Sequence, residues 1–402
     1  MMKTAKKIRL QPAMNSDAAR KVMAALQTDV QPGAAYFVGG CVRDAILELG
    51  VEDVDIATVF VPEKVVELLE VSGIKAIPTG IEHGTITAVI DDQCFEITTL
   101  RKDVQTFGRH ADVEFSSDYL EDAKRRDFTI NTLLTDLEGH IYDPLDCGLN
   151  DLNEGRVRFV GDPDLRIKED YLRILRFFRF YGRYENGDPD QDALIACKAN
   201  ANQLASLSKE RIGQEFFKIL SGDNCVDIIK LMFSCNVLNG LSDSAYNDSA
   251  LNKLVSLQKE FELHDCLARL LMISRDQDKF DEFFVLSVKQ KKHIKAMSEV
   301  LDGHDVFDLQ QAKKMIYLYE QNAALQAFLI MMSLGETNID IRELLHWQAP
   351  EFPLRGNDLI KAGVLEGPEL GKTLSEIEQW WLDQGMLPDR QSCLEKLNQN
   401  LN

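Results

Sequence analysis

The sequence predicts an α+β protein, in which a small domain with a mixed β-sheet is followed by a long region made of helices. Two observations carry this prediction. Up to about residue 145, short runs rich in β-branched residues alternate with helical stretches and with Gly, Asp and Pro turn signals. Beyond Asp146, apolar residues recur with a period near 3.6 over long segments, which is typical of helices that bury one face.

The elements of the first region follow from local signals. Strands are predicted over 36–38, 54–57, 85–90 and 95–99, where β-branched and aromatic residues cluster. Helices are predicted over 42–49 and over 62–71, the second with Pro62 in its first turn. In the second region, the 3.6-residue period predicts helices over 170–184, 208–220, 252–263 and 313–332, and the proline-containing break at 349–353 precedes the final helices.

Length and composition exclude several classes of protein. The chain has 402 residues, enough for two to four domains, and no run approaches the roughly 20 apolar residues of a membrane-spanning helix. Its basic first residues lack the apolar stretch of a signal peptide. The eight cysteines include no C-x-x-C pair, which argues against a zinc ribbon or a disulfide scaffold. We therefore expect a soluble cytoplasmic protein with reduced thiols and no membrane association.

The formal net charge of −20 argues against indiscriminate binding to nucleic acid through bulk charge. It does not exclude a nucleic-acid substrate, because phosphate contacts need only a local basic surface. Such a surface is present between residues 156 and 183, where Lys and Arg outnumber Asp and Glu.

The first chemical motif is the turn from Val38 to Asp44. Gly39 and Gly40 follow a short strand and precede a helix, so the backbone can approach a ligand closely at a helix N-terminus that favours phosphate. Arg43, one turn into the helix, adds a charged donor. On its own, such a turn is more often only a connection between two elements.

The second motif is a pair of carboxylates. Asp53 and Asp55 alternate along a predicted strand, so both point to the same face of the sheet. Carboxylates held close together favour a bound cation, and oxygen ligands suit Mg²⁺. Glu96, on a later strand, is a possible third ligand, and three such groups can hold two ions for an in-line phosphoryl displacement. An isolated D-x-D pair is usually only a solvated acidic surface.

The third motif is an arginine-rich helix over residues 169–179. At 100° per residue, Arg173, Arg176 and Arg179 share one side of this helix, and apolar residues occupy mainly the other. The apolar side is predicted to be core. The arginine side is either a solvated surface, which is the commoner case for a row of charges, or a site for an anionic, planar ligand.

Together with the segment Arg125 to Asn131, these motifs in this order resemble the head of the tRNA nucleotidyltransferase and poly(A) polymerase family, and more narrowly the bacterial class II CCA-adding enzymes. The resemblance runs from about residue 35 to 183 and resumes near the C-terminus. It implies a polymerase-β-like nucleotidyltransferase head over 17–145, which is catalytic. A helical neck over 146–215 would recognise nucleotide and base, and a helical body and tail over 216–402 would bind tRNA.

The resemblance also implies roles for single residues. Gly40 and Arg43 would contact the phosphates of the incoming nucleotide, and Arg126 would be a further nucleotide contact. Asp53 and Asp55 would be the catalytic carboxylates that bind Mg²⁺. On the arginine-rich helix, Asp170 and Arg173 would read the base, while Arg176 and Arg179 would reach the sugar-phosphate region.

Hydrogen-bond donor and acceptor patterns explain how a pair of protein side chains can select C and A. Both bases present an exocyclic amino donor beside a ring-nitrogen acceptor, whereas guanine and uracil present a carbonyl beside a ring N–H. A carboxylate that accepts from the amine and a guanidinium that donates to the ring nitrogen therefore select C and A together. Asp170 and Arg173 lie one helical turn apart and can supply that pair.

Within the family, the stretch His83-Gly84-Thr85 is similar to CCA-adding enzymes, and a stretch expected of bacterial poly(A) polymerases is missing. The polar segment 101–110 matches the flexible loop that lets these enzymes switch from C to A. We expect addition of C, C and A to tRNA from CTP and ATP, with release of pyrophosphate. The alternatives are partial (CC or A) addition, poly(A) synthesis and a catalytically silent tRNA-binding protein; no protein partner is inferred.

Three remaining features are interpreted as structural. The pairs His264-Asp265 and His304-Asp305 lack the further ligands of an H-D metal site. The adjacent Trp380 and Trp381 are predicted to pack in a core rather than to stack on bases.

Overall fold

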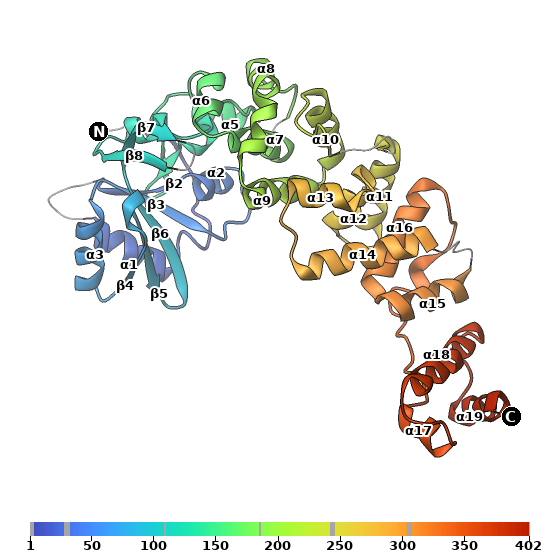
Figure 1. Ribbon diagram of the computed structural model, residues 1–402. Helices are drawn as coiled ribbons and strands as arrows, with labels where there is room; N and C mark the ends of the chain where they lie inside the picture. The colour runs from blue at the N-terminus through green and yellow to red at the C-terminus, as the bar shows by residue number, and fades with distance from the viewer. Residues whose placement is uncertain are drawn as a thin grey trace. The chain divides into compact units, whose positions relative to one another are not determined.

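The computed structural model describes residues 4–27, 33–107, 110–184, 186–241, 246–303 and 308–401, without the side chains of residues 83 and 103–113. The chain divides into two compact units, Met1–Asn239 and Gly240–Asn402 (Figure 1). The predicted α+β class, a mixed sheet followed by helices, is confirmed. The pair His304-Asp305 lies outside the described residues.

A mixed eight-stranded sheet forms the core of the first unit. Its strand order is β1-β10-β9-β2-β3-β6-β5-β4, and only the pair β3–β6 is parallel among these described strands. The four predicted strands correspond to β2, β3, β5 and β6. The bounds are β1 Thr4–Lys7, β2 Ala35–Val38, β3 Val54–Thr58, β4 Lys75–Gly80, β5 Thr85–Ile90, β6 Gln93–Thr99, β9 Leu134–Thr135 and β10 His140–Tyr142.

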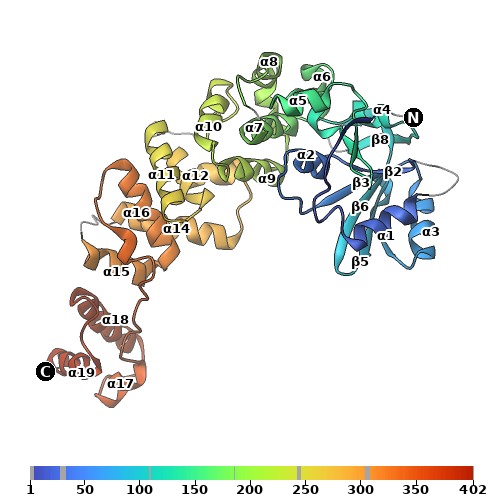
Figure 2. The same ribbon diagram turned by 180° about the vertical axis from the view of Figure 1, so that it is seen from behind.

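Short helices cover this sheet. They are α1 (Asp17–Leu26), α2 (Gly40–Ile46), α3 (Pro62–Val71) and α4 (Tyr119–Lys124). Helices α1 and α3 pack on each other and on the strands β5 and β6, as Figure 2 shows. Helix α2 begins earlier than predicted, at Gly40 rather than Val42, because Gly39 makes the turn out of β2 at a φ of +75°.

The described part of the first unit contains six further α-helices: α5 (Gly148–Asn153), α6 (Pro163–Glu169), α7 (Leu172–Tyr184), α8 (Gln191–Asn200), α9 (Lys209–Leu220) and α10 (Cys225–Ser234). Helix α7 packs against α6, α9 and α10. A Cβ at Gly182 would lie 2.8 Å from Ile228 Cγ1, so this glycine allows the close approach of α7 and α10. Asp170 precedes α7 in an extended conformation, so the helix starts at Leu172 rather than at Asp170.

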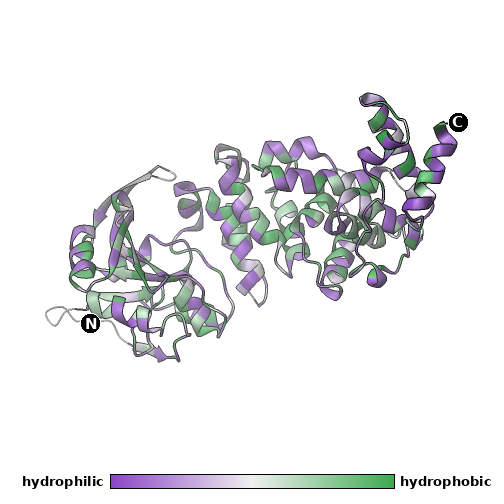
Figure 3. Ribbon diagram, turned by 90° about the horizontal axis from the view of Figure 1, so that it is seen from below, coloured by the Kyte–Doolittle hydropathy of each residue, from purple (hydrophilic) through white to green (hydrophobic). Residues whose placement is uncertain are grey.

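The second unit is helical throughout its described secondary structure. It comprises α11 (Asp248–Glu260), α12 (Cys266–Ile273), α13 (Gln277–Phe283), α14 (Val288–Gly303), α15 (Leu309–Tyr319), α16 (Gln321–Leu334), α17 (Gly356–Lys361), α18 (Pro368–Asp383) and α19 (Arg390–Leu401). Purple and green alternate around many helices in Figure 3, the pattern of helices with one apolar face. In the described residues, no helix is both long and apolar enough to cross a membrane.

One helix prediction for this unit was wrong. Residues 313–332 do not form a single helix, because Glu320 adopts a φ of +75° and separates α15 from α16. Helix α16 is buried on nearly all sides, from Ala323 to Met331. Because apolar residues occupy every face of α16, their spacing gives no sign of the change of direction at Glu320.

The pair His264-Asp265 has a structural environment. Asp265 caps α12 by accepting hydrogen bonds from the backbone N–H groups of Leu267 and Ala268. Its Oδ2 lies 2.6 Å from Nε2 of His293 on α14. These contacts join α12 to α14, in agreement with the structural interpretation.

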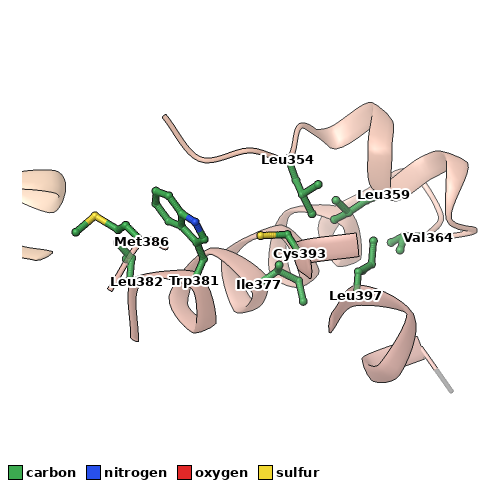
Figure 4. Packing of buried hydrophobic residues seen from close by; sticks show 9 residues of the cluster. All are labelled: Leu354, Leu359, Val364, Ile377, Trp381, Leu382, Met386, Cys393 and Leu397. Atoms are coloured by element: carbon green, nitrogen blue, oxygen red, sulfur yellow. The ribbon is translucent and has the colours of Figure 1, made fainter. Parts of the chain in front are cut away.

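A separate apolar cluster holds α17, α18 and α19 together (Figure 4). Trp381 is its largest buried member, with 1% of its surface exposed, and its rings meet Tyr317 and Phe352 edge-on. The indole Nε1 donates to the carbonyl of Pro388 at 2.9 Å, so the buried polar group is satisfied. Trp381 therefore packs in a core as predicted, while Trp380 is only partly buried.

Substitution Trp381→Ala tests this core. Loss of a fully buried indole leaves a cavity, so we expect the free energy of unfolding of this unit to fall by about 3–5 kcal/mol. Trp380→Ala is the matched control and should cost clearly less. Urea unfolding monitored by near-UV circular dichroism measures both, and equal losses for the two variants would contradict the assigned packing.

Candidate active site

The predicted pair of carboxylates lies at the start of β3. Asp53 directly precedes this strand and Asp55 is its second residue, while Val54 and Ile56 are buried on the other face. Parallel pairing with β6 places Asp55 in register with Glu96. The sheet thus brings Asp53, Asp55 and Glu96 to one place, as the alternation predicted for the first two residues.

The electrostatics of Asp55 show how closely these groups interact. Burial raises the pKa of the Asp55 carboxyl from its ordinary 3.8 to about 6, and the negative charges of Glu96 and Asp53 act in the same direction. Arg126 opposes them. A cation would relieve this repulsion, and the all-oxygen donor set suits a hard divalent ion.

Another acidic group offers ligand atoms that lie within 4.8 Å of one another: Asp136, Glu138 and His140. Its geometry has a structural cause. Asp136 Oδ1 accepts from the backbone N–H groups of Glu138 and His140, and its Oδ2 accepts from the Tyr142 hydroxyl. Asp136 therefore closes the turn between β9 and β10, and we assign no metal to it.

The glycine turn faces two arginines. A Cβ at Gly39 would lie 3.4 Å from Arg126 Nη1, and one at Gly40 would lie 3.6 Å from Arg43 Nη2. Arg43 is 6% exposed, and its other nitrogens are engaged. Nε donates to Asp44 Oδ1 at 2.8 Å and Nη1 donates to Asn131 Oδ1 at 2.6 Å. The guanidinium carbon also lies 4.2 Å from the centre of the Tyr184 ring.

Each of the five arginines predicted to contact nucleotide pairs with a carboxylate. Their side chains are only 7–31% exposed, so burial without a counter-charge would be costly. The pairs are Arg43–Asp44, Arg126–Asp122, Arg173–Glu169, Arg176–Asp127 and Arg179–Glu215.

Sequence reasoning gave these five carboxylates no role. The usable signals were local. Asp44 and Asp127 stand beside motif arginines, and Glu215 shares the buried face of α9 with Phe216 and Ile219.

Asp127 connects the head to the arginine-rich helix. Its Oδ2 accepts from Arg176 Nε at 2.7 Å, while Oδ1 accepts from Asn131 Nδ2 at 3.0 Å and from the backbone N–H of Phe128 at 2.9 Å. Burial alone would raise the pKa of Asp127. Arg176 and the hydrogen bonds outweigh burial and hold this pKa well below its usual range.

The two predicted base-reading residues are held by different partners. Asp170 Oδ2 accepts from Arg211 Nη2 at 2.7 Å, and Oδ1 accepts from the backbone N–H of Leu172 at 3.2 Å. Arg173 Nη1 donates to the carbonyl of Arg166 at 2.8 Å and pairs with Glu169. The backbone N–H of Arg173 donates to the Asp170 carbonyl at 3.0 Å. In the described part of the chain, no hydrogen bond joins the two side chains.

Two cavities border these residues. One of about 830 Å³ is lined by Glu52 and Asp53 of the head, by Arg179 and Arg183 of α7, and by residues between Phe217 and Ile228. A second cavity of about 330 Å³ opens beside Asp170 and Arg211. The larger cavity places Asp53 and Arg179 in one space of nucleotide size.

The predicted mobile loop over residues 101–110 has regular backbone structure. Strands β7 (Arg101–Phe107) and β8 (His110–Phe115) pair antiparallel as a separate two-stranded sheet. Gly108 and Arg109 lie outside the described residues, as do the side chains of residues 103–113. Its movement between C and A addition stays a prediction.

Comparisons with known proteins agree on one family. Residues 35–158 match the model of the poly A polymerase head domain, and residues 188–243 match that of the probable RNA and SrmB-binding site of polymerase A. The mitochondrial CCA tRNA nucleotidyltransferase 1 of Danio rerio is 36% identical over 90% of this chain and 86% of its own. The CCA-adding enzyme of Lactobacillus helveticus is 34% identical over 89% and 92%.

Solved structures show the same relationship. The Bacillus stearothermophilus CCA-adding enzyme in complex with CTP has a TM-score of 0.72 and 25% identity, covering 92% of this chain and 94% of its own. The Thermotoga maritima CCA-adding enzyme complexed with tRNA, at 20% identity and a TM-score of 0.70 over the full length of both chains, shares the fold.

The raised pKa of Asp55 predicts a pH-dependent stability of the metal-free protein. The carboxyl group of Asp55 binds its proton more tightly in the folded chain than in the unfolded chain. Protonation of Asp55 therefore stabilises the folded chain fully below about pH 4, and this stabilisation is lost as the pH rises through about 6. Asp55→Asn should therefore raise the free energy of unfolding at pH 7 by about 1–3 kcal/mol relative to its effect at pH 4. Urea unfolding with chelator at both pH values measures this, and an identical pH dependence in wild type and variant would refute it.

Proposed function

Because the chain belongs to the family of CCA-adding tRNA nucleotidyltransferases, we propose that it adds C, C and A to the 3′ end of tRNA from CTP and ATP and releases pyrophosphate. One observation carries the mechanism. The sheet register places Asp55 beside Glu96, and the charge of Asp53 also acts on Asp55. Arg126, which lies beside the glycine turn, acts on Asp55 in the opposite direction. The carboxylates proposed to bind metal and the groups proposed to bind phosphate are therefore adjacent.

Within this proposal, Asp53 and Asp55 hold Mg²⁺, with Glu96 as the third oxygen ligand. Burial is the main cause of the raised pKa of Asp55, and the negative charges of Glu96 and Asp53 add to it; a divalent cation would relieve that repulsion. When bound, the metal lowers the pKa of the primer 3′-hydroxyl and stabilises charge on the departing pyrophosphate.

The triphosphate is bound by the glycine turn and two arginines. The backbone of Gly39 and Gly40 can approach phosphate oxygens because neither residue carries a Cβ. Arg126 Nη1 would lie 3.4 Å from a Cβ at Gly39, and Arg43 Nη2 would lie 3.6 Å from one at Gly40. Asp44, Asn131 and Asp122 fix the two guanidinium groups before substrate arrives, so little rearrangement is needed.

Base selection is assigned to the start of α7. Asp170 accepts from the exocyclic amine of cytosine or adenine and Arg173 donates to the ring nitrogen. Arg176 and Arg179 serve the sugar-phosphate region, and Arg179 lines the same cavity as Asp53. Residues 17–145 thus catalyse, residues 146–215 select the nucleotide, and residues 216–402 bind tRNA.

We place this activity in the cytoplasm. No disulfide is formed by the cysteines of the described residues, which fits a reducing compartment.

Primer extension on a tRNA transcript that ends at its discriminator base tests the function. With Mg²⁺, CTP and ATP, we expect wild-type product to stop after C, C and A. Asp55→Asn should abolish extension while far-UV circular dichroism stays native, because one metal ligand is lost. The control is Asp92→Asn in the β5–β6 turn, where Asn tolerates the φ of +59° and activity should persist.

Other products would change the proposal. A stop after two C residues, or addition of A only to a CC-ended primer, would indicate partial addition. A long A tail would indicate a poly(A) polymerase. Full activity of Asp55→Asn would refute the metal assignment.

A further inference from the structure

Arg211 occupies a position that sequence reasoning did not identify. It lies in the first turn of α9, where Ser208 Oγ accepts from its backbone N–H, and it reaches to the junction between α6 and α7. Its Nη2 donates to Asp170 Oδ2 at 2.7 Å, and only 18% and 20% of the two side chains are exposed. An ion pair that is shielded from water in this way is stronger than one on an open surface.

The Asp170 carboxylate is held at both oxygens. Oδ1 accepts from the backbone N–H of Leu172 at 3.2 Å, and Oδ2 accepts from Arg211. The carboxylate therefore cannot rotate without breaking one of these bonds. It still has acceptor capacity for a ligand, because a carboxylate offers about four lone-pair positions.

The surroundings leave room for a change of rotamer. A cavity of about 330 Å³ beside the pair is lined by Lys168, Asp170, Tyr171, Ser206, Ser208 and Arg211, among others. Without Arg211, the Asp170 side chain has space into which it can turn. The ion pair, rather than close packing, fixes its direction.

We propose that Arg211 is a positioning residue that sets base specificity by holding Asp170 rigid, an inference that rests on the proposed function. Uracil and guanine present a carbonyl oxygen where cytosine and adenine present an amine. A rigid carboxylate repels that carbonyl, whereas a carboxylate released from Arg211 turns away from it. Arg211 thereby strengthens rejection of the wrong bases rather than binding of the right ones.

The test compares CTP and UTP incorporation into a tRNA transcript by Arg211→Met, Arg211→Lys and wild type. A well-placed bidentate base contact is worth about 1–3 kcal/mol of discrimination, so we expect Arg211→Met to raise the UTP/CTP ratio of kcat/KM by about tenfold or more. The kcat for CTP should fall by a smaller factor than the one by which this ratio rises. Arg211→Lys keeps the charge and should restore part of the discrimination. Gln214→Met, at an exposed position of the same helix, is the control and should leave the ratio unchanged.

A double-mutant cycle with Asp170→Asn separates positioning from a direct contact. If Arg211 acts through Asp170, Arg211→Met should not change the UTP/CTP ratio further in the Asp170→Asn background. An equal loss for both nucleotides in Arg211→Met, or the same shift in both backgrounds, would overturn the inference.

The outcome is separable from that of the proposed function. Equilibrium dialysis of CTP and UTP against the same variants reports base preference without tRNA or catalysis. Wild-type protein that fails to extend tRNA yet binds CTP over UTP, with the preference lost in Arg211→Met, would refute the CCA-adding function and support the role of Arg211. Unchanged preference in Arg211→Met would refute that role whatever the extension assay shows.

Discussion

The burial of the arginines of α7 is the constraint on which the site depends. Arg176 and Arg179 are largely withdrawn from water, and a guanidinium in such a place requires a carboxylate. The carboxylates come from distant parts of the chain, Asp127 from the head and Glu215 from α9. Removing one member of such a buried pair typically costs about 3–5 kcal/mol. The pairs therefore tie the head, α7 and α9 into one arrangement.

This arrangement accounts for a strongly acidic protein that handles polyanions. The arginines assigned to nucleotide binding are few and local, and the partner carboxylates fix their directions without removing every donor. Arg43, for example, donates hydrogen bonds from Nε to Asp44 and from Nη1 to Asn131, while its Nη2 lies beside Gly40. Donors that are oriented before substrate arrives stabilise developing charge without reorganisation. The surplus of acidic residues elsewhere discourages non-specific binding.

Local sequence signals predicted the elements that carry the chemistry. The alternation around Asp53 and Asp55 predicted their common face, and the paired glycines predicted the turn at Gly39. What could not be predicted depends on tertiary contacts. No local pattern indicates that Arg211 meets Asp170, 41 positions away in the chain, or that Glu215 neutralises Arg179. The break at Glu320 was missed for a different reason, because residues apolar on all sides give no periodic signal at a change of direction.

The central claim is that protein side chains, rather than a nucleic-acid template, choose the base. Equilibrium binding of CTP, ATP, UTP and GTP to the wild-type protein with Mg²⁺ and without tRNA tests it most directly. The account predicts that CTP and ATP bind with similar affinity and that UTP and GTP bind about tenfold more weakly or worse, as the loss of a bidentate base contact implies. Equal affinity for all four nucleotides would contradict it.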